Sequence, residues 1–270
     1  MNNKKQLIKA GNLSINYQLL GSAEKPVVTL AHSLATDMRM WEPQLAALTQ
    51  HFRVLLIDAR GHGNSDIPAI PYSMDELVDD VLAVWNALDI ERSHFVGLSM
   101  GGMTGVGIAL KAPQRLLSLV ACDCRLDAPA FFQDMWDKRL IAVNSGGMDA
   151  VVDMTLQTWF TKDKIVNDPN LIGAVADMIA ATPETGYLGC AMALKSLDYK
   201  RSLNNIKTPT LYLVGAQDGP HPEEMADNTK LTPNAQFAVI ENAAHLSNME
   251  QPTEFNTLVL NFLLNITPGQ

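Results

Sequence analysis

The sequence predicts an α/β fold built on a mostly parallel sheet with helices on both faces. Short runs that are apolar throughout alternate with amphipathic stretches, as expected of parallel strands buried between helices. This alternation stops after Cys124 and returns near Thr210. We therefore expect one α/β core, residues 1–124 and 204–270, interrupted by a helical insertion, residues 125–203.

The composition sets limits on partners and location. The 270 residues are 47% hydrophobic and 18% charged, with a net charge of -9, so the chain can bury a large core. The acidic balance and scattered basic residues disfavour nucleic acid and anionic membranes as partners. No apolar run approaches the roughly 20 residues of a membrane-spanning helix, and the N-terminus lacks a signal-peptide core. Three cysteines, an odd number, favour a reduced, cytoplasmic protein.

Local patterns place the elements of the core. Short apolar runs predict strands at residues 27–30, 54–57, 94–96, 116–121, 211–214 and 237–240, and alternation at 13–19 is typical of an edge strand. Amphipathic segments predict helices at residues 43–49, 101–112, 222–230 and 253–264. Ser73 and Glu76 form a capping-box pattern that opens a further helix, whose apolar face runs from Leu77 to Leu88.

The segment Gly97-Leu98-Ser99-Met100-Gly101 lies between a predicted strand and a predicted helix. This setting makes the G-x-S-x-G match a candidate nucleophile elbow, in which a tight turn lifts the serine hydroxyl clear of the sheet. The following helix points its N-terminus at the same place, which favours developing negative charge. Ser99 is therefore the candidate nucleophile.

A serine nucleophile needs a base, and histidine has the pKa suited to that role. His245 lies between the last predicted strand and the last helix, where hydrolases with this elbow carry their base. We expect Asp218, in the loop after strand 211–214, to orient the imidazole. Asp123, after strand 116–121, remains an alternative, because a carboxylate there could reach the same imidazole.

Two backbone amides are expected to bind the oxyanion of a tetrahedral intermediate. One belongs to Met100, directly after the nucleophile, and the other to Leu34, in the loop after strand 27–30. In the same loop, we expect His32 to tie the backbone down and Ser33 to border the substrate pocket. The glycine-rich turn at residues 58–65 is expected to be scaffold near that pocket.

With these motifs the chain resembles the α/β-hydrolase superfamily over nearly its whole length. The superfamily motifs are His32-Ser33-Leu34, Asp58-x-Arg60-Gly61-x-Gly63-x-Ser65, Gly97-x-Ser99-x-Gly101-Gly102, Asp218 and His245. Within the superfamily it is most similar to 3-oxoadipate enol-lactonases, which often have Asn at the position of His32. The more local matches are Thr36-Asp37-x-x-Met40-Trp41, Trp159-Phe160-Thr161, Gly186-Tyr187 and Ala244-His245-Leu246-Ser247-Asn248.

The resemblance implies an eight-stranded, mostly parallel sheet flanked by helices, with a helical cap inserted after strand six. It implies hydrolysis of a small-molecule ester or lactone without a cofactor. Carried over residue by residue, it supports Ser99, Asp218 and His245 as the catalytic triad. It also supports Leu34 and Met100 as the oxyanion donors.

The insertion is expected to roof the pocket and select the acyl group, with Trp136 and Trp159 among its lining residues. A substrate with a free carboxylate would need a cation nearby. The candidates, which the sequence does not separate, are Arg125, Arg139, Lys195 and Arg201. No metal is expected, because neither the histidines nor the Cys122-x-Cys124 pair has the spacing of a zinc site.

Other functions stay open at this point. Acyl-homoserine lactonases and general short-chain carboxylesterases share the local segments. The same triad could serve cofactor-free haloperoxidase or perhydrolase chemistry, or hydrolysis of a carbon–carbon bond in a diketone. A non-catalytic binding module on a hydrolase fold is the alternative from another class. Such a module could lose any triad member, whereas all three are present here. The natural substrate and the oligomeric state do not follow from the sequence.

Overall fold

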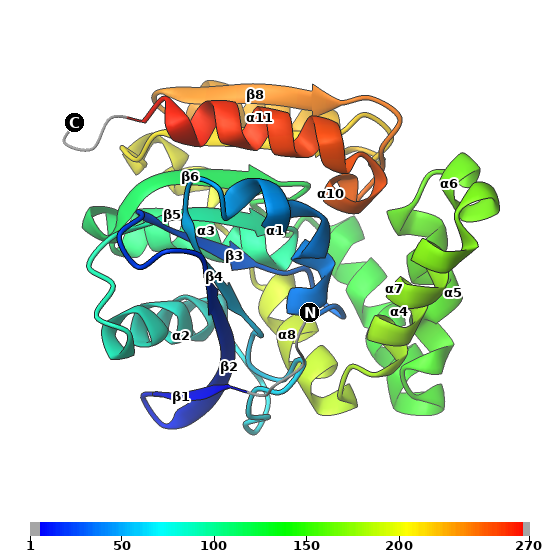
Figure 1. The fold of residues 1–270 in the computed structure, drawn as a ribbon. Helices are drawn as coiled ribbons and strands as arrows, with labels where there is room; N and C mark the ends of the chain where they lie inside the picture. The colour runs from blue at the N-terminus through cyan, green and yellow to red at the C-terminus, as the bar shows by residue number, and fades with distance from the viewer. Residues whose placement is uncertain (1–5, 267–270) are drawn as a thin grey trace.

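An eight-stranded sheet forms the centre of the molecule, in the order β1-β2-β4-β3-β5-β6-β7-β8 (Figure 1). The computed structural model describes residues 6–266. From β4 to β8 all neighbouring strands are parallel, whereas β2 pairs antiparallel with both β1 and β4. The strands are β1 (Leu7–Ala10), β2 (Leu13–Leu20), β3 (Val27–Ala31), β4 (Arg53–Ile57), β5 (Ser93–Leu98), β6 (Leu116–Cys122), β7 (Thr210–Gly215) and β8 (Ala235–Ile240).

Helices cover both faces of this sheet, as the apolar strands require. The pair α1 and α11 packs on one face and the pair α2 and α3 on the other (Figure 1). The core helices are α1 (Glu42–Leu48), α2 (Met74–Ala87), α3 (Met100–Lys111), α9 (His221–Leu231), α10 (Ser247–Glu250) and α11 (Pro252–Leu264). Short 3₁₀ turns lie at η1 (Met38–Trp41), η2 (Pro113–Arg115) and η3 (Lys200–Asn205).

The structure confirms the predicted parallel core and its capping box, and corrects one strand. At the start of α2, the Ser73 hydroxyl accepts from the Glu76 amide at 3.3 Å, and a Glu76 carboxylate oxygen accepts from the Ser73 amide at 2.9 Å. The strand predicted at residues 13–19 is present as β2, but its expected edge position is wrong. Its first half is covered by β1, a four-residue strand that is too short for its pattern to predict.

Five helices separate β6 from β7: α4 (Ala130–Gly146), α5 (Asp149–Trp159), α6 (Lys162–Asn167), α7 (Pro169–Ala180) and α8 (Glu184–Lys195). We call this segment the helical insertion. It lies beyond the carboxyl ends of the parallel strands, toward which the strand arrows point (Figure 1). A β-bridge between Asp127 and Asp198 joins its two ends, and the Tyr199 amide donates to the Leu126 carbonyl at 2.8 Å. The two chain segments that connect the insertion to the core therefore lie side by side.

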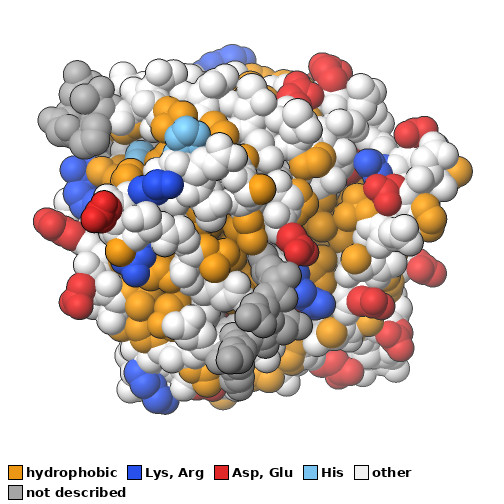
Figure 2. Space-filling model, in the orientation of Figure 1, with side chains coloured by type: hydrophobic (Ala, Val, Ile, Leu, Met, Phe, Trp, Pro, Cys, Tyr) orange, Lys and Arg blue, Asp and Glu red, His pale blue; other side chains and the backbone are white. Residues whose placement is uncertain are grey.

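The surface agrees with the charge pattern of the sequence. On the face shown in Figure 2, Lys and Arg side chains lie apart from one another among acidic and uncharged ones. Hydrophobic side chains gather in the middle of this face, beside the insertion. None of the helices between residues 6 and 266 combines the length and the apolar character needed to cross a bilayer.

Candidate active site

Ser99 occupies a strained turn between β5 and α3. Its backbone angles are φ 54° and ψ -116°, in the left-handed half of conformational space that a residue with a Cβ rarely adopts. A Cβ at Gly97 would lie 2.2 Å from the Gly101 carbonyl oxygen, and one at Gly101 would lie 2.0 Å from the Ala31 carbonyl oxygen. Only glycine fits at these two positions, so the predicted elbow follows directly from packing.

The elbow places Ser99 at the carboxyl edge of the sheet. Its amide donates to the Cys122 carbonyl at 2.8 Å, and its carbonyl accepts from the Met103 amide at 2.9 Å, inside α3. The side chain is largely buried, with 8% of the residue exposed. The first turn of α3 directly follows Ser99, so the partial positive charge of that helix end falls on this position.

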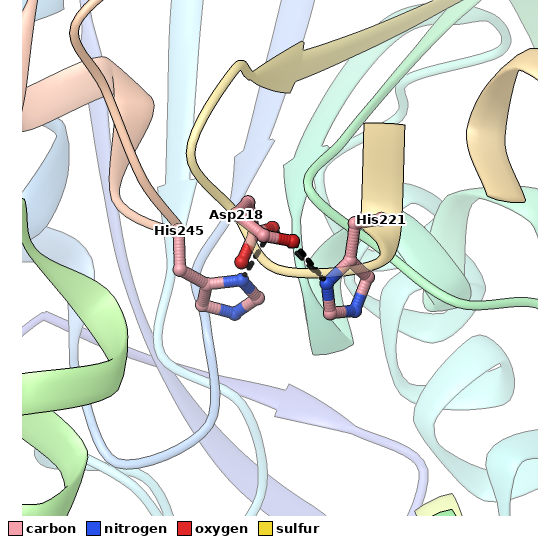
Figure 3. A group of neighbouring side chains, drawn as sticks. All are labelled: Asp218, His221 and His245. Atoms are coloured by element: carbon pink, nitrogen blue, oxygen red, sulfur yellow. Dashed lines mark hydrogen bonds and ion pairs between the residues drawn. The ribbon is translucent and has the colours of Figure 1, made fainter. Parts of the chain in front are cut away.

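Asp218 and His245 meet in the loops after β7 and β8. The His245 Nδ1 donates to the Asp218 Oδ2 at 2.9 Å, which fixes the ring and leaves Nε2 as its free nitrogen (Figure 3). Burial opposes ionisation of Asp218, but His245 and the neighbouring His221 outweigh it and hold the pKa of Asp218 below its usual value. The pair is therefore a buried carboxylate against an oriented imidazole.

Asp123 has other partners. Its Oδ1 accepts from the Gly215 amide at 2.8 Å, and its Oδ2 lies 2.5 Å from the Ser247 hydroxyl. Complete burial, reinforced by the charge on Asp218, raises the pKa of Asp123 well above its usual value. The shift favours the neutral form of this carboxyl, which links the loops after β6, β7 and β8 through these two hydrogen bonds.

The sequence analysis missed His221, the first residue of α9. Its Nδ1 lies 3.0 Å from the Asp218 carbonyl oxygen and 3.4 Å from Asp218 Oδ2. The signal was present in the sequence, because a histidine three residues after the acid falls at the start of the next helix. Burial alone would lower the pKa of His221, but attraction by Asp218 raises it above its usual value.

The loop after β3 holds the first predicted oxyanion donor. The amides on either side of Leu34 are engaged, since Ser33 donates to the Met40 sulfur at 3.3 Å and Ala35 to His62 Nε2 at 3.1 Å. In the described part of the chain the Leu34 amide itself has no protein acceptor. The other predicted donor, Met100, begins α3, and its amide has no acceptor within that helix.

His32 has the structural role that was predicted for it. Its Nδ1 contacts the Ser33 carbonyl at 2.7 Å and its Nε2 accepts from the Ala59 amide at 2.9 Å. His62 makes the reciprocal link, from the turn after β4 back to Ala35. Complete burial lowers the pKa of His62 to about 3, so this ring stays neutral. The two rings, 5.3 Å apart, thus tie the Leu34 loop to the neighbouring turn.

That turn, residues 58–65, is organised by Asp58. Its carboxylate accepts from the amides of Met38 and Asn64 at 3.0 Å each, and from Asn16 Nδ2 at 2.7 Å. Arg60 leaves the same turn and pairs with Asp80 at 2.6 Å. The turn is scaffold, as expected, and carries none of the groups arranged around Asp218.

The insertion reaches His245 through Trp159, the last residue of α5. The two rings stack, with centroids 5.9 Å apart and planes 28° from parallel. The Leu246 amide donates to the Trp159 carbonyl at 3.2 Å. The Glu250 carboxylate reinforces this join, since it accepts from the amide of Thr161 at 2.9 Å and from that of Ala244 at 2.5 Å. The predicted pocket residue Trp159 therefore lies against the candidate base.

Trp136 lies deeper in the insertion. It packs edge-on against Phe132 and Tyr187, at centroid distances of 5.8 and 6.4 Å. Nine buried side-chain polar atoms have no hydrogen-bond partner among the described residues, and they include Ser33 Oγ and Trp136 Nε1. The Tyr187 hydroxyl is also among them, and it lies beside the Arg139 guanidinium. Buried polar groups are normally paired, so these atoms stand out in the insertion and the Leu34 loop.

The structure separates the four basic candidates that the sequence left equal. Arg125 pairs with Glu224 and with Asp127, Lys195 pairs with Asp137, and the exposed Arg201 pairs with Asp198. In residues 6–266 Arg139 forms no ion pair. Its guanidinium lies 5.7 Å from the centre of the Trp136 ring and donates to Thr155 Oγ1 at 2.8 Å.

Asp218, His221 and His245 also bring one ligand-type atom each within 4.8 Å of the others. The Nδ1 atoms of both rings, however, face oxygens of Asp218 at hydrogen-bonding distance, and a nitrogen that donates a hydrogen bond has no lone pair for a metal. The contacts are those of a hydrogen-bonded group around one carboxylate.

Comparison with known proteins agrees with this geometry. Residues 26–252 match the family model described as alpha/beta hydrolase fold. The 3-oxoadipate enol-lactonase 1 of Acinetobacter baylyi is 34% identical over 94% of both chains, and the putative carbamate hydrolase RutD of Pseudomonas savastanoi is 31% identical over 89% of this chain and 95% of its own. The crystal structure of the enol-lactonase from Burkholderia xenovorans superposes with a TM-score of 0.92 at 32% identity, over 96% of this chain and all of the other.

The chain thus belongs to the α/β-hydrolase family. The match extends through the core on both sides of the insertion, so the expected fold is confirmed. Hydrolysis is the chemistry shared by the named relatives, and their names cover both a lactone and a carbamate.

The raised pKa of the buried Asp123 leads to a prediction about stability. A raised pKa means that the folded state binds more protons, so the free energy of unfolding falls as pH rises above about 3.9. Asp123→Asn keeps the shape and removes this penalty. We expect its stability relative to the wild type to improve with pH, by up to about 1.4 kcal/mol per unit until the folded carboxyl ionises. Urea unfolding at pH 5 and pH 8 measures this.

The exposed Asp227 supplies a control of opposite sign. Lys230 lowers its pKa, so Asp227→Asn cannot gain stability as pH rises. An Asp123→Asn variant that lost stability between pH 5 and pH 8 would contradict a neutral Asp123.

Proposed function

We propose that this protein is a serine hydrolase that cleaves a lactone or carboxylic ester through Ser99, His245 and Asp218. The observation that carries the proposal is the 2.9 Å contact between His245 Nδ1 and Asp218 Oδ2. It leaves His245 Nε2 free at the sheet edge where the elbow presents Ser99. An oriented imidazole beside a buried carboxylate is the arrangement that activates a serine hydroxyl.

The chemistry then proceeds in two steps. His245 takes the Ser99 proton as Oγ attacks the carbonyl carbon, and Asp218 stabilises the imidazolium that results. The proton passes to the leaving alkoxide, and an acyl-enzyme remains. His245 next removes a proton from water, which attacks the acyl carbon and returns Ser99. In a lactone the leaving alcohol stays tethered to the acyl group, so one hydroxy acid, or its keto form, is released.

The oxyanion formed in each step needs fixed donors. The amides of Leu34 and Met100 suit this role, because neither has an acceptor among residues 6–266. The Leu34 loop is tied down by His32 and His62, and Met100 begins α3. Each such donor contributes about 10²- to 10³-fold in rate. The N-terminal end of α3 adds a favourable dipole at the same point.

We further propose that the substrate carries a free carboxylate, which Arg139 binds. This guanidinium, unlike those of Arg125 and Arg201, has no acidic partner among residues 6–266, yet it lies among aromatic rings. Trp136 Nε1 is unpaired close by, and the Tyr187 hydroxyl lies beside the same guanidinium, so both can donate to the same anion. The enol-lactonase relatives point the same way, since a monolactone of an adipate keeps one free carboxyl group.

The position of Arg139 suits a short dicarboxylate. Arg139 bonds to Thr155, which lies one turn before Trp159 on α5, and Trp159 stacks on His245. One helical turn advances about 5.4 Å. Arg139 and His245 are thus both in contact with the same two turns of α5, as the recognition of a short dicarboxylate would require.

Replacement of the nucleophile tests the reaction class. Ser99→Ala should lower hydrolysis of an enol-lactone or a p-nitrophenyl ester by at least about 10⁴-fold, because the covalent route is lost. A fluorophosphonate should add one label to the wild type and none to Ser99→Ala, as measured by intact mass. Ser22→Ala, at an exposed loop serine, is the matched control. Full esterase activity in Ser99→Ala would exclude the scheme.

Paired substitutions identify the acid. Asp218→Asn should lower kcat by about 10³- to 10⁴-fold, because the amide cannot stabilise the His245 imidazolium. Asp123→Asn should change kcat less than threefold, because Asn preserves the two hydrogen bonds of a neutral carboxyl. Steady-state kinetics on one ester compare the two variants. The reverse ranking would assign the role to Asp123.

Substrate class is tested at Arg139. Arg139→Gln should lower kcat/KM for a carboxylate-bearing enol-lactone by about 10- to 100-fold, mainly through KM, because a charge-assisted hydrogen bond is lost. Neutral p-nitrophenyl esters, acyl-homoserine lactones and a carbamate should be affected less than threefold. Arg201→Gln, which removes the same charge from the surface, is the control. Equal losses on charged and neutral substrates would refute carboxylate recognition.

A further inference from the structure

Two histidines contact one carboxylate in this site, and the scheme above uses only one of them. Asp218 Oδ2 lies 2.9 Å from His245 Nδ1 and 3.4 Å from His221 Nδ1 (Figure 3). The two rings approach from opposite sides of the carboxylate, with centroids 5.6 Å apart and planes at 49°. Any charge on His221 is therefore felt both by Asp218 and by the catalytic imidazole.

The His221 ring is held in place whether or not it is charged. Its Nδ1 lies 3.0 Å from the Asp218 main-chain carbonyl, an acceptor that takes a hydrogen from either protonation state. Nε2 is then the nitrogen that gains and loses the proton. The side chain is 17% exposed, so that proton can exchange with water.

The charged and titratable groups around His221 come from four elements. Asp218 and Glu224 attract a proton to it, and Glu224 is itself held by Arg125 at the start of the insertion. His245 faces it from the loop after β8. Asp123, after β6, adds no charge while it is protonated. The balance raises the pKa of His221 above its usual value, which favours the protonated ring beside Asp218.

We propose that His221 is a positioning residue that competes with His245 for the Asp218 carboxylate and lowers hydrolysis when it is protonated. This inference rests on the proposed function, because it needs His245 as the base. A positive His221 neutralises the carboxylate that stabilises the His245 imidazolium, and repels that imidazolium directly. At about 5.6 Å and an effective dielectric near 20, the repulsion corresponds to about a hundredfold in proton affinity.

The effect on rate is smaller than the effect on proton affinity, because the proton is only partly transferred in the transition state. We expect kcat/KM to fall on the order of tenfold as His221 gains its proton. Because a charged His221 disfavours a second positive charge on the ring 5.6 Å away, activity should hold at a lower plateau before it is lost. The acid side of the wild-type profile should therefore contain two steps.

The experiment is the pH dependence of kcat/KM from pH 5 to pH 9, with a neutral p-nitrophenyl ester that does not itself ionise as a carboxylic acid. His221→Gln should show one step and should match the wild type within twofold at high pH. At the pH of the lower plateau it should be about tenfold faster than the wild type. His51→Gln, at an exposed loop histidine, should keep both steps.

Three outcomes would overturn the inference. They are a single step in the wild type, unchanged two-step behaviour in His221→Gln, or a loss in His221→Gln that is the same at every pH. The last would show that the ring is merely structural. Should His221→Gln unfold, ¹⁵N NMR of the wild-type imidazoles replaces it, and His221 must then titrate before His245. Ester hydrolysis that survives Ser99→Ala would instead refute the underlying function, so the two failures are distinguishable.

Discussion

The close approach of α3 to the sheet is the constraint on which the site depends. Gly101 leaves no room for a Cβ against the Ala31 carbonyl, and Gly97 leaves none against Gly101. Strand, turn and helix are thereby locked together, and Ser99 is left with a positive φ that an isolated chain would avoid. The well-packed parallel sheet on both sides supplies the stability that such a strained residue costs. The same approach brings the first amide of α3 and the loop after β3 to one edge of the sheet.

Burial and neighbouring groups then set the pKa of each of the two carboxyls at that edge. Asp218 and Asp123 are both buried carboxyls from adjacent strand ends, yet their pKa values are pushed in opposite directions. The difference lies in their partners, because Asp218 has two histidines whereas Asp123 has one amide and one hydroxyl. Repulsion between the two groups strengthens the division, since ionisation of one disfavours ionisation of the other.

Most of the core was predictable because each element carries a local signal. Apolar runs, one capping box and the elbow motif fixed the strands, the start of α2 and the position of Ser99. The β1 strand was missed, since its pairing with β2 is set by the chain reversal between them rather than by its own composition. Arg139 could not be distinguished from the other cations by pattern for a different reason. It stands out only after the ion pairs of Arg125, Lys195 and Arg201 are known. His221 did carry a signal, three residues after Asp218, but its contact with the carboxylate appears only in three dimensions.

The proposed substrate-binding residues lie on the insertion and the proposed catalytic residues lie on the core. The two segments are in contact at His245. The loop that carries this residue donates from Leu246 to the Trp159 carbonyl, and Glu250 holds both Thr161 and Ala244. A displacement of α5 would therefore move the ring that stacks on His245 together with the backbone on either side of it. Arg139 also bonds to α5, so the proposed anion site and the contacts to His245 share one helix. The insertion thus holds the His245 ring from one side while Asp218 holds it from the other.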